Sequence, residues 1–188
     1  RRRGLDDKTI VRFGLGYAPN DGQALYQYLR DKGYNQQELD ASGLFKRSQS
    51  GRIYCLFWKR VMTPIFDLRG NIIAFGGRVM DDSKPKYVNS PETLVYHKSE
   101  TVFAMQIAKR SASRRFVLCE GYMDVISMQQ AGIDTAVCAC GTALTPGQVR
   151  IISEYADEVI LSYDSDEAGQ KATLRSLELF RNSPVKVG

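Results

Sequence analysis

Acidic residues follow two apolar runs of the chain, and their spacing is the feature that best indicates a catalytic or metal-binding site. Glu120 follows the run 116–119, and Asp164 and Asp166 follow the run 159–163. If both runs are parallel strands, their carboxyl ends meet where α/β sheets bind ligands. Three carboxylates gathered there repel one another unless a divalent cation neutralises them. The sequence therefore predicts a magnesium or manganese site, and magnesium in proteins commonly accompanies phosphate.

Some of these acids also have a purely structural explanation. Asp-x-Asp is a common sequence in solvated loops, and Asp166 is well placed to cap a helix that begins near Glu167. Asp124, four residues after Glu120, suits the first turn of a helix, where its charge interacts favourably with the helix dipole. Two roles therefore stay open for Asp124: it stabilises that helix alone, or it also supports the metal-binding acids.

The elements expected to position the acids alternate along the second half of the chain. Apolar runs predict strands at 116–119, 135–140, 159–163 and from 185 onward; helical spacing predicts helices at 100–112, 123–130, 146–155 and 168–181. A turn is expected at Gly141-Thr142, and Thr145 and Pro146 suit the start of the third helix. This alternation predicts an α/β fold with a mainly parallel sheet flanked by helices.

The first half of the chain has a different pattern. It predicts short helices at 6–13, 22–32 and 36–42, a strand hairpin over 61–76, and a polar loop over 81–98. Pro64 restricts its strand to a sheet edge or a bulge. We therefore predict two domains: a smaller, basic, mixed α+β subdomain over residues 1–98, followed by the sheet domain over residues 99–188.

Charge is divided unevenly between the two halves. Residues 1–115 hold 21 of the 26 Lys and Arg but only 11 of the 21 Asp and Glu. The remaining residues hold 5 Lys and Arg and 10 Asp and Glu. A basic part joined to an acidic part fits a protein that holds a polyanion and a metal. The alternative is that Arg1-Arg2-Arg3 and Arg114-Arg115 are merely solvated, but the asymmetry survives their removal.

Other residue types exclude some kinds of protein and of site. No apolar stretch approaches the roughly 18 residues of a membrane span, and no signal peptide is evident, so we expect a cytoplasmic protein with no membrane partner. The four cysteines lack CxxC spacing, which favours buried, reduced thiols over a zinc site or disulfides. His97 is the only histidine, so a histidine-rich metal site is excluded and nucleophilic catalysis by histidine is disfavoured.

A second set of candidate residues surrounds the loop 85–93. Lys86, Tyr87 and Asn89 offer a cation, an aromatic ring and an amide, between prolines that limit the freedom of the loop. Lys86 and Lys98 suit phosphate, Asn89 suits a sugar or base edge, and Arg60 and Arg78 would extend the basic surface. The alternative is a surface loop with incidental lysines. Phe57 and Trp58 are able to stack on bases, but we expect them to pack in the core.

Several motifs carry a resemblance to known families. The segments 120–125, 141–145 and 163–169 (EGYMDV, GTALT and YDSDEAG) resemble the motifs of the Toprim domain, a metal-binding module of primases, topoisomerases of types IA and II, and some nucleases. The segments 13–19, 60–65, 73–78 and 85–93 are similar to the bacterial replicative primase of the DnaG type. The resemblance extends over essentially the whole chain.

The resemblance implies a nucleotidyltransferase, an RNA polymerase that makes short primers on single-stranded DNA with Mg²⁺ or Mn²⁺ by two-metal phosphoryl transfer. By motif position, it implies that Glu120, Asp164 and Asp166 bind metal, with Asp124 close by. Nucleotide and template would contact Arg60, Arg78, Lys86, Tyr87, Asn89 and Lys98. The implied partners are single-stranded DNA, ribonucleoside triphosphates, an RNA–DNA hybrid and, through a further domain, the replicative helicase.

Parts of the family's proteins lie outside this sequence. They are the zinc-ribbon domain upstream and, downstream, a later acidic motif, a helical bundle and the helicase-binding domain. We therefore expect a catalytic fragment that is weakly active or inactive alone, with zinc only in the absent N-terminal domain. Two rival functions stay open: a topoisomerase or nuclease that uses the same acids, although none of the ten tyrosines identifies itself as a nucleophile, and a binding module without turnover.

Overall fold

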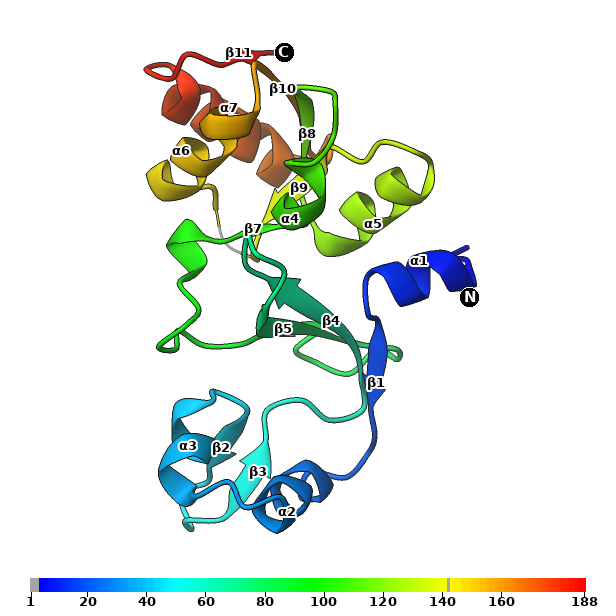
Figure 1. Ribbon diagram of the computed structural model, residues 1–188, viewed down its shortest axis with the longest axis vertical. Coiled ribbons are helices and arrows are strands. Elements are labelled where there is room, and N and C mark those ends of the chain that lie inside the picture. The colour runs from blue at the N-terminus through cyan, green and yellow to red at the C-terminus, as the bar shows by residue number, and fades with distance from the viewer. Residues whose placement is uncertain (1–3, 142) are drawn as a thin grey trace. The chain divides into compact units, whose positions relative to one another are not determined.

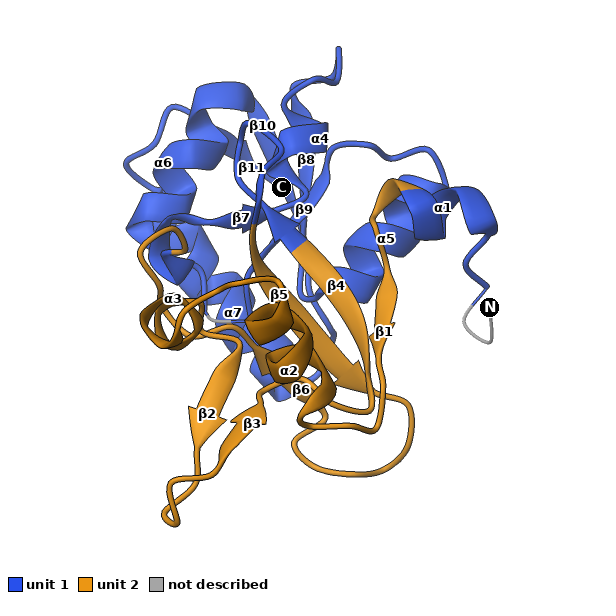
Figure 2. Cartoon of the chain, turned by 60° about the horizontal axis from the view of Figure 1, so that its bottom comes forward, with its two compact units in different colours: residues 1–11, 65–72, 97–188 blue, residues 12–64, 73–96 orange. Residues whose placement is uncertain are grey.

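A computed structural model describes residues 4–141 and 143–188 (Figure 1). Arg1-Arg2-Arg3 and Thr142 of the expected turn lie outside the described residues. The chain divides into two compact units (Figure 2): residues 1–11, 65–72 and 97–188 form unit 1, and residues 12–64 and 73–96 form unit 2. The structure differs here from the single predicted boundary between 98 and 99, because hydropathy patterns reveal elements but not their packing partners.

Unit 1 is built on a five-stranded sheet in the order β11-β10-β8-β9-β7. Its strands are β7 (Val102–Phe103), β8 (Arg115–Cys119), β9 (Ala136–Ala139), β10 (Glu158–Ser162) and β11 (Lys186–Val187). The pairs β8–β9, β8–β10 and β10–β11 are parallel, and only the edge strand β7 runs antiparallel, to β9. The predicted mainly parallel α/β sheet is confirmed.

Helices cover both faces of this sheet. They are α4 (Met105–Ala108), α5 (Tyr122–Gln130), α6 (Pro146–Tyr155) and α7 (Glu167–Phe180). Figure 1 shows α5 on one face and α6 and α7 on the other. The strand order explains this, because right-handed crossovers that run in opposite directions along a sheet place their helices on opposite faces. From β8 the chain crosses to β9 in one direction along the sheet, and from β10 it crosses to β11 in the opposite direction. The carboxyl ends of β8 and β10 therefore form the topological switch point of the sheet.

A closed apolar core fixes these strand ends. Phe116 and Leu118 of β8, Val159 of β10, Ile152 of α6 and Phe180 of α7 all belong to it, and each is 2% exposed or less. Burying a large apolar side chain contributes about 1.5–3 kcal/mol. All four cysteines of the chain lie among the described residues and are buried, as predicted, and no disulfide joins them. Burial raises the pKa of the Cys119 thiol to about 12, so this thiol stays protonated at neutral pH.

One element of unit 1 was predicted wrongly. Instead of a helix over 100–112, the chain forms a 3-10 turn, η1 (Lys98–Glu100), then β7, and only four residues of helix, α4. Ala104 has a positive φ of 64°, which separates β7 from α4. Val102 and Phe103 fitted a helical pattern, but they are buried as an edge strand against β9.

Unit 2 holds a four-stranded sheet in the order β1-β4-β5-β6 and a separate hairpin. Its elements are β1 (Gly16–Ala18), α2 (Ala24–Asp31), α3 (Gln36–Ala41), β2 (Phe45–Arg47), β3 (Ile53–Cys55), β4 (Arg60–Phe66), β5 (Ile72–Val79) and β6 (Tyr87–Asn89), with the ends of β4 and β5 in unit 1. The remaining helix, α1 (Asp7–Arg12), lies almost wholly in unit 1. The predicted hairpin and short helices are confirmed, whereas the prediction of loop over 81–98 is wrong at β6.

Pro64 lies in a strand that is internal to the sheet order, which differs from the expectation of an edge strand or a bulge. Strand β1 pairs with β4 only at residues 60–62. Pro64 lies beyond this short partner, so its missing N–H leaves no bond to β1 unmade. Among the described residues, no helix is both long and apolar enough to cross a membrane.

Candidate functional site

Glu120 and Asp164 lie at the switch point of the unit 1 sheet. Glu120 directly follows β8, Asp164 comes two residues after β10, and the parallel register aligns Cys119 with Ser162. Because the two strands end level with each other, the Glu120 side chain reaches the Asp164 backbone. The backbone N–H of Asp164 donates to Oε2 of Glu120 at 3.2 Å. The structure therefore brings together two of the acids that the sequence pattern selected.

Asp124 and Asp166 each hold the start of a helix. Oδ2 of Asp124 accepts a hydrogen bond from the Gly121 N–H at 3.0 Å, at the entrance to α5. Oδ1 of Asp166 accepts from the Gly169 N–H at 2.8 Å and caps α7. The structural explanation of both residues is therefore correct, and any metal-binding role would come in addition to these hydrogen bonds.

The chemistry of these acids fits a hard divalent cation. Glu120, Asp124, Asp164 and Asp166 are all exposed, and within residues 4–141 and 143–188 none of them pairs with a Lys or Arg. Oxygen donors with uncompensated negative charge are the ligands that Mg²⁺ and Mn²⁺ prefer. Their arrangement is less complete, since the described residues contain no group of three His, Cys, Asp or Glu placed to hold a metal. Metal binding by these acids stays a prediction.

Gly169 positions the loop that carries Asp164, a role that the sequence analysis missed. Gly169 is buried in the first turn of α7, and a Cβ added there would lie 1.9 Å from the carbonyl oxygen of Asp164. Only glycine allows the helix to pack this closely against the loop. The available signal was a glycine near the start of a helix, where it costs about 1 kcal/mol relative to alanine without a compensating role.

The backbone that carries Lys98 is held by the first turn of α6. The fully buried Gln148 donates from Nε2 to the carbonyls of Lys98 and Thr101, at 2.9 Å each. Thr145, the N-cap predicted for α6, also donates its hydroxyl to the Ser99 carbonyl at 2.6 Å. The sequence analysis did not single out Gln148, although the capping-box spacing of Thr145 and Gln148 was visible.

Replacing Gln148 with leucine is expected to lower the free energy of unfolding by about 2–3 kcal/mol, because the buried Thr101 carbonyl and the part-buried Lys98 carbonyl lose their donor. Urea denaturation followed by circular dichroism measures the loss. Gln37→Leu is the control, since Gln37 is an exposed helical glutamine, and it should stay within about 0.5 kcal/mol of the parent chain. A loss of that small size for Gln148→Leu would contradict the positioning role.

The basic candidates of unit 2 gather on β5 and β6. Arg78 and Tyr87 are paired directly across these strands, and Nε of Arg78 donates to the Tyr87 hydroxyl at 3.0 Å. The guanidinium carbon lies 5.5 Å from the centre of the half-exposed tyrosine ring. Lys86 precedes Tyr87, and Asn89 lies two residues beyond it, on the same face of the strand. Four predicted residues are thus neighbours, whereas Lys98 belongs to unit 1.

The segment 57–60, which leads into β4, has buried residues at its two ends and exposed residues between them. Phe57 and Arg60 are buried, at 4% and 5% exposed, whereas Trp58 is 47% exposed. Core packing is therefore confirmed for Phe57 and wrong for Trp58. Lys59, which directly precedes β4, has a φ of 51°, and its Nζ lies 2.8 Å from Oδ2 of Asp81. The sequence analysis placed Arg60 on the binding surface, but its burial keeps the side chain from direct contact with a ligand.

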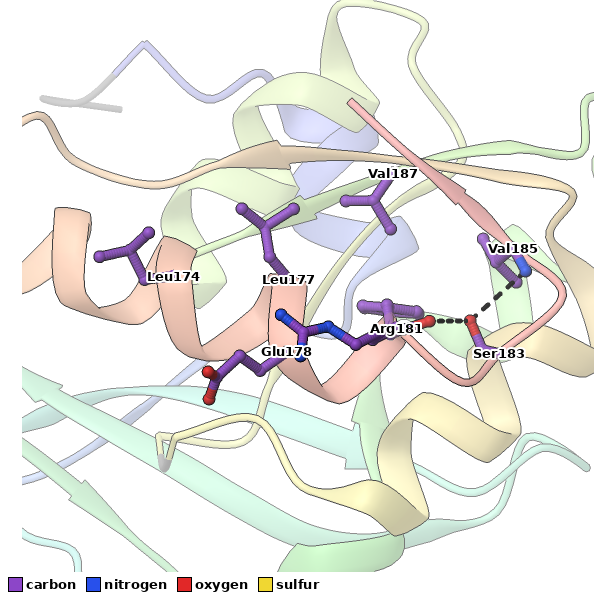
Figure 3. A pocket seen from close by; sticks show the side chains of 8 residues that line it. Leu174, Leu177, Glu178, Arg181, Ser183, Val185 and Val187 are labelled. Atoms are coloured by element: carbon purple, nitrogen blue, oxygen red, sulfur yellow. Dashed lines mark hydrogen bonds between the residues drawn. The ribbon is translucent and has the colours of Figure 1, made fainter.

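A pocket of about 550 Å³ lies elsewhere in unit 1, between α7 and β11. Its lining residues include Leu174, Leu177, Glu178, Arg181 and Val187 (Figure 3). The Ser183 hydroxyl donates to the Phe180 carbonyl and accepts from the Val185 N–H, which links the end of α7 to the segment before β11. None of the predicted site residues lines this pocket, so it is separate from the candidate site.

Comparison with known proteins gives consistent matches in sequence and structure. A family model described as the DNA primase catalytic core, N-terminal domain, matches residues 1–109, and a Toprim-like model matches residues 117–187. Among similar curated proteins, the DNA primase of Clostridium acetobutylicum is 44% identical over 182 residues, which cover 96% of this chain and 30% of that protein. The chain thus spans less than a third of the length of this relative.

Solved primase structures have the same fold as this chain. The Aquifex aeolicus primase (zinc-binding and RNA polymerase domains) matches with a TM-score of 0.90 and 36% identity, over 99% of this chain and 46% of that one. The RNA polymerase domain of Mycobacterium tuberculosis primase DnaG, in complex with a double-stranded DNA oligomer with a 6-nucleotide overhang, matches with a TM-score of 0.83 and 35% identity, over 94% and 59%. With more than half of its residues matched by the first family model, the chain belongs to the family of the DNA primase catalytic core and carries a Toprim-like domain after the N-terminal one.

Proposed function

We propose that this chain is part of an enzyme that synthesises short RNA primers on single-stranded DNA during replication, by metal-dependent nucleotidyl transfer. One observation carries the proposal: the Glu120 carboxylate is held against the Asp164 backbone at the switch point of a Toprim-like sheet. Membership of the primase core family supports the same activity. The two-domain division at residue 98 remains part of the proposal, as a division between nucleotide-binding and metal-binding functions.

Glu120, Asp164 and Asp166 would hold Mg²⁺ or Mn²⁺, with Asp124 beside them. A bound divalent ion supplies a more acidic primer hydroxyl and neutralises charge on the phosphates. The strands β8 and β10 hold two of these acids on a rigid sheet, which limits the reorganisation needed during reaction. His and Cys nucleophiles are not required, in keeping with the raised pKa of the buried Cys119 thiol.

The basic residues would bind the nucleotide and the template. Arg78, Lys86 and Lys98 would neutralise the triphosphate, and Tyr87 and Asn89 would orient the sugar or base. Contacts to phosphate carry no base information, which suits an enzyme that copies any template and selects nucleotides by pairing. The M. tuberculosis domain bound to a DNA oligomer with an overhang supports a single-stranded template as partner. We propose ribonucleoside triphosphates, an RNA–DNA hybrid and the replicative helicase as further partners, in the cytoplasm.

Incorporation of labelled ribonucleotides tests this function, measured with a longer protein that includes this chain and the downstream part of the family's catalytic core. A DNA template with an annealed RNA primer removes the need for initiation, and Mg²⁺ or Mn²⁺ is added or chelated. We expect extension of the primer only with the divalent ion. Nicking or relaxation of supercoiled DNA without incorporation would favour a nuclease or topoisomerase instead. Binding of single strands that is independent of metal, without turnover, would favour a binding module.

A further inference from the structure

Arg60 is a buried cation without an ion-pair partner among the described residues of unit 2. Among the described residues its one hydrogen bond runs from Nη1 to the Lys86 carbonyl, at 3.4 Å, and its Nε is buried without a partner. No described carboxylate forms an ion pair with it. Asp81 acts on the guanidinium only through its charge, and Asp81 is itself paired with Lys59 at 2.8 Å. The positive charge of Arg60 is therefore only partly compensated by the protein.

A glycine lets the Arg60 side chain cross the sheet. At Gly77 of β5, an added Cβ would lie 3.0 Å from Cδ of Arg60 and 2.8 Å from the Phe57 ring. Arg60 starts on β4, passes over β5 at this glycine, and bonds to the residue just before β6. Its charged end therefore lies beneath the two strands that carry the basic candidates.

Burial of this charge lowers the stability of the fold, and a bound anion would offset that loss. Desolvation lowers the pKa of the Arg60 guanidinium, with the charge of Asp81 acting in the opposite direction, but an arginine remains protonated at neutral pH. A charge removed from water without a partner destabilises the fold. The same charge raises the electrostatic potential at the adjacent strands, where low dielectric and poor screening make it act over a longer range than an exposed lysine does.

We propose that Arg60 is a positioning residue that prepares β6 for a polyphosphate anion such as a nucleoside triphosphate. Its hydrogen bond holds the Lys86 backbone, and its only partly compensated charge attracts the anion from beneath, without contact. The inference rests on the proposed function, because it places the triphosphate against Arg78 and Lys86. It goes beyond that function by assigning affinity to a residue that the ligand does not touch.

Calorimetric binding of ATP and of inorganic triphosphate tests this role. We expect Arg60→Met to weaken the binding of both ligands about tenfold, as loss of a nearby unit charge would. The affinity of Arg60→Lys should stay within about threefold of that of the parent chain. The melting temperature of Arg60→Met should stay equal or rise, because an apolar side chain replaces an unpaired buried charge. Arg78→Met should flatten the salt dependence of binding, since a direct phosphate contact is lost, whereas Arg60→Met should leave this dependence unchanged.

The possible contrary results are distinguishable. If the parent chain and Arg78→Met differ in binding but Arg60→Met equals the parent, the inference is overturned and the proposed function stands. If Arg60→Met and Arg60→Lys lose binding and melting temperature together, the residue is merely structural and the inference is again overturned. If the parent chain binds neither anion, the proposed nucleotide site fails and takes the inference with it.

Discussion

Glu120→Gln is expected to reduce divalent-dependent ribonucleotide incorporation by at least about a hundredfold, which corresponds to roughly 3 kcal/mol of transition-state stabilisation. The glutamine carbonyl can still accept the hydrogen bond that the Asp164 N–H donates at 3.2 Å. The substitution therefore removes a negative charge from the end of β8 while it preserves the local bond. Single-turnover extension of a primed template by the longer protein that includes this chain measures the rate, and electron paramagnetic resonance of Mn²⁺ measures metal binding.

Glu154→Gln is the matched control for this experiment. Glu154 is an exposed acid on α6, away from the switch point, and its loss should leave both incorporation and Mn²⁺ binding unchanged. Equal activity of Glu120→Gln and the parent chain would remove Glu120 from the metal site. Equal loss in both variants would indicate a general effect of net charge instead of a specific ligand.

Gly169→Ala is expected to destabilise the chain by about 3 kcal/mol and to weaken Mn²⁺ binding at least tenfold. The new Cβ would lie 1.9 Å from the Asp164 carbonyl oxygen and 2.8 Å from its carbon, so either α7 or the acidic loop must move. The contact is with backbone, which cannot rotate away as a flexible side chain does. Urea denaturation measures the free energy of unfolding, and electron paramagnetic resonance of Mn²⁺ measures the loss of metal binding that displacement of Asp164 would cause.

The sign of the stability change makes this test decisive. Alanine in an unobstructed helix position would stabilise the chain by up to about 1 kcal/mol relative to glycine. A stabilised Gly169→Ala variant with normal metal binding would therefore show that the helix does not press on the loop. Ser165→Ala, an exposed change in the same loop, should leave stability within about 0.5 kcal/mol and metal binding intact.

The elements of unit 1 were largely predictable from the sequence because each buried strand there is a continuous apolar run. The predicted helix 146–155 coincides with α6, and its N-cap Thr145 was also predicted. In β7 the same reasoning failed. Two buried residues, Val102 and Phe103, carry too little pattern to separate an edge strand from a helix, and only their pairing with β9 decides between them.

The candidate site was predictable in position more than in contacts. The ends of parallel strands meet by geometry, so the proximity of Glu120 and Asp164 followed from the order of elements. The burial of Arg60 did not follow, because a cation beside an aromatic pair usually indicates an exposed surface and the space over Gly77 appears only after folding. Likewise, the two bonds from Gln148 join residues about fifty positions apart, beyond the range of a local pattern.

Unit 1 is assembled from three separate stretches of the chain, which limits where two related sequences can be recombined. A single genetic crossover near residue 97 would transfer most of the unit but leave residues 1–11 and 65–72 behind. Gln130, which bonds to the Asp6 N–H and the Gly4 carbonyl at 2.9 Å each, would then have to fit the N-terminal segment of the other parent. The core would receive that parent's residue at the position of Leu68. Chimaeras between relatives should therefore retain function only when all three stretches come from the same parent.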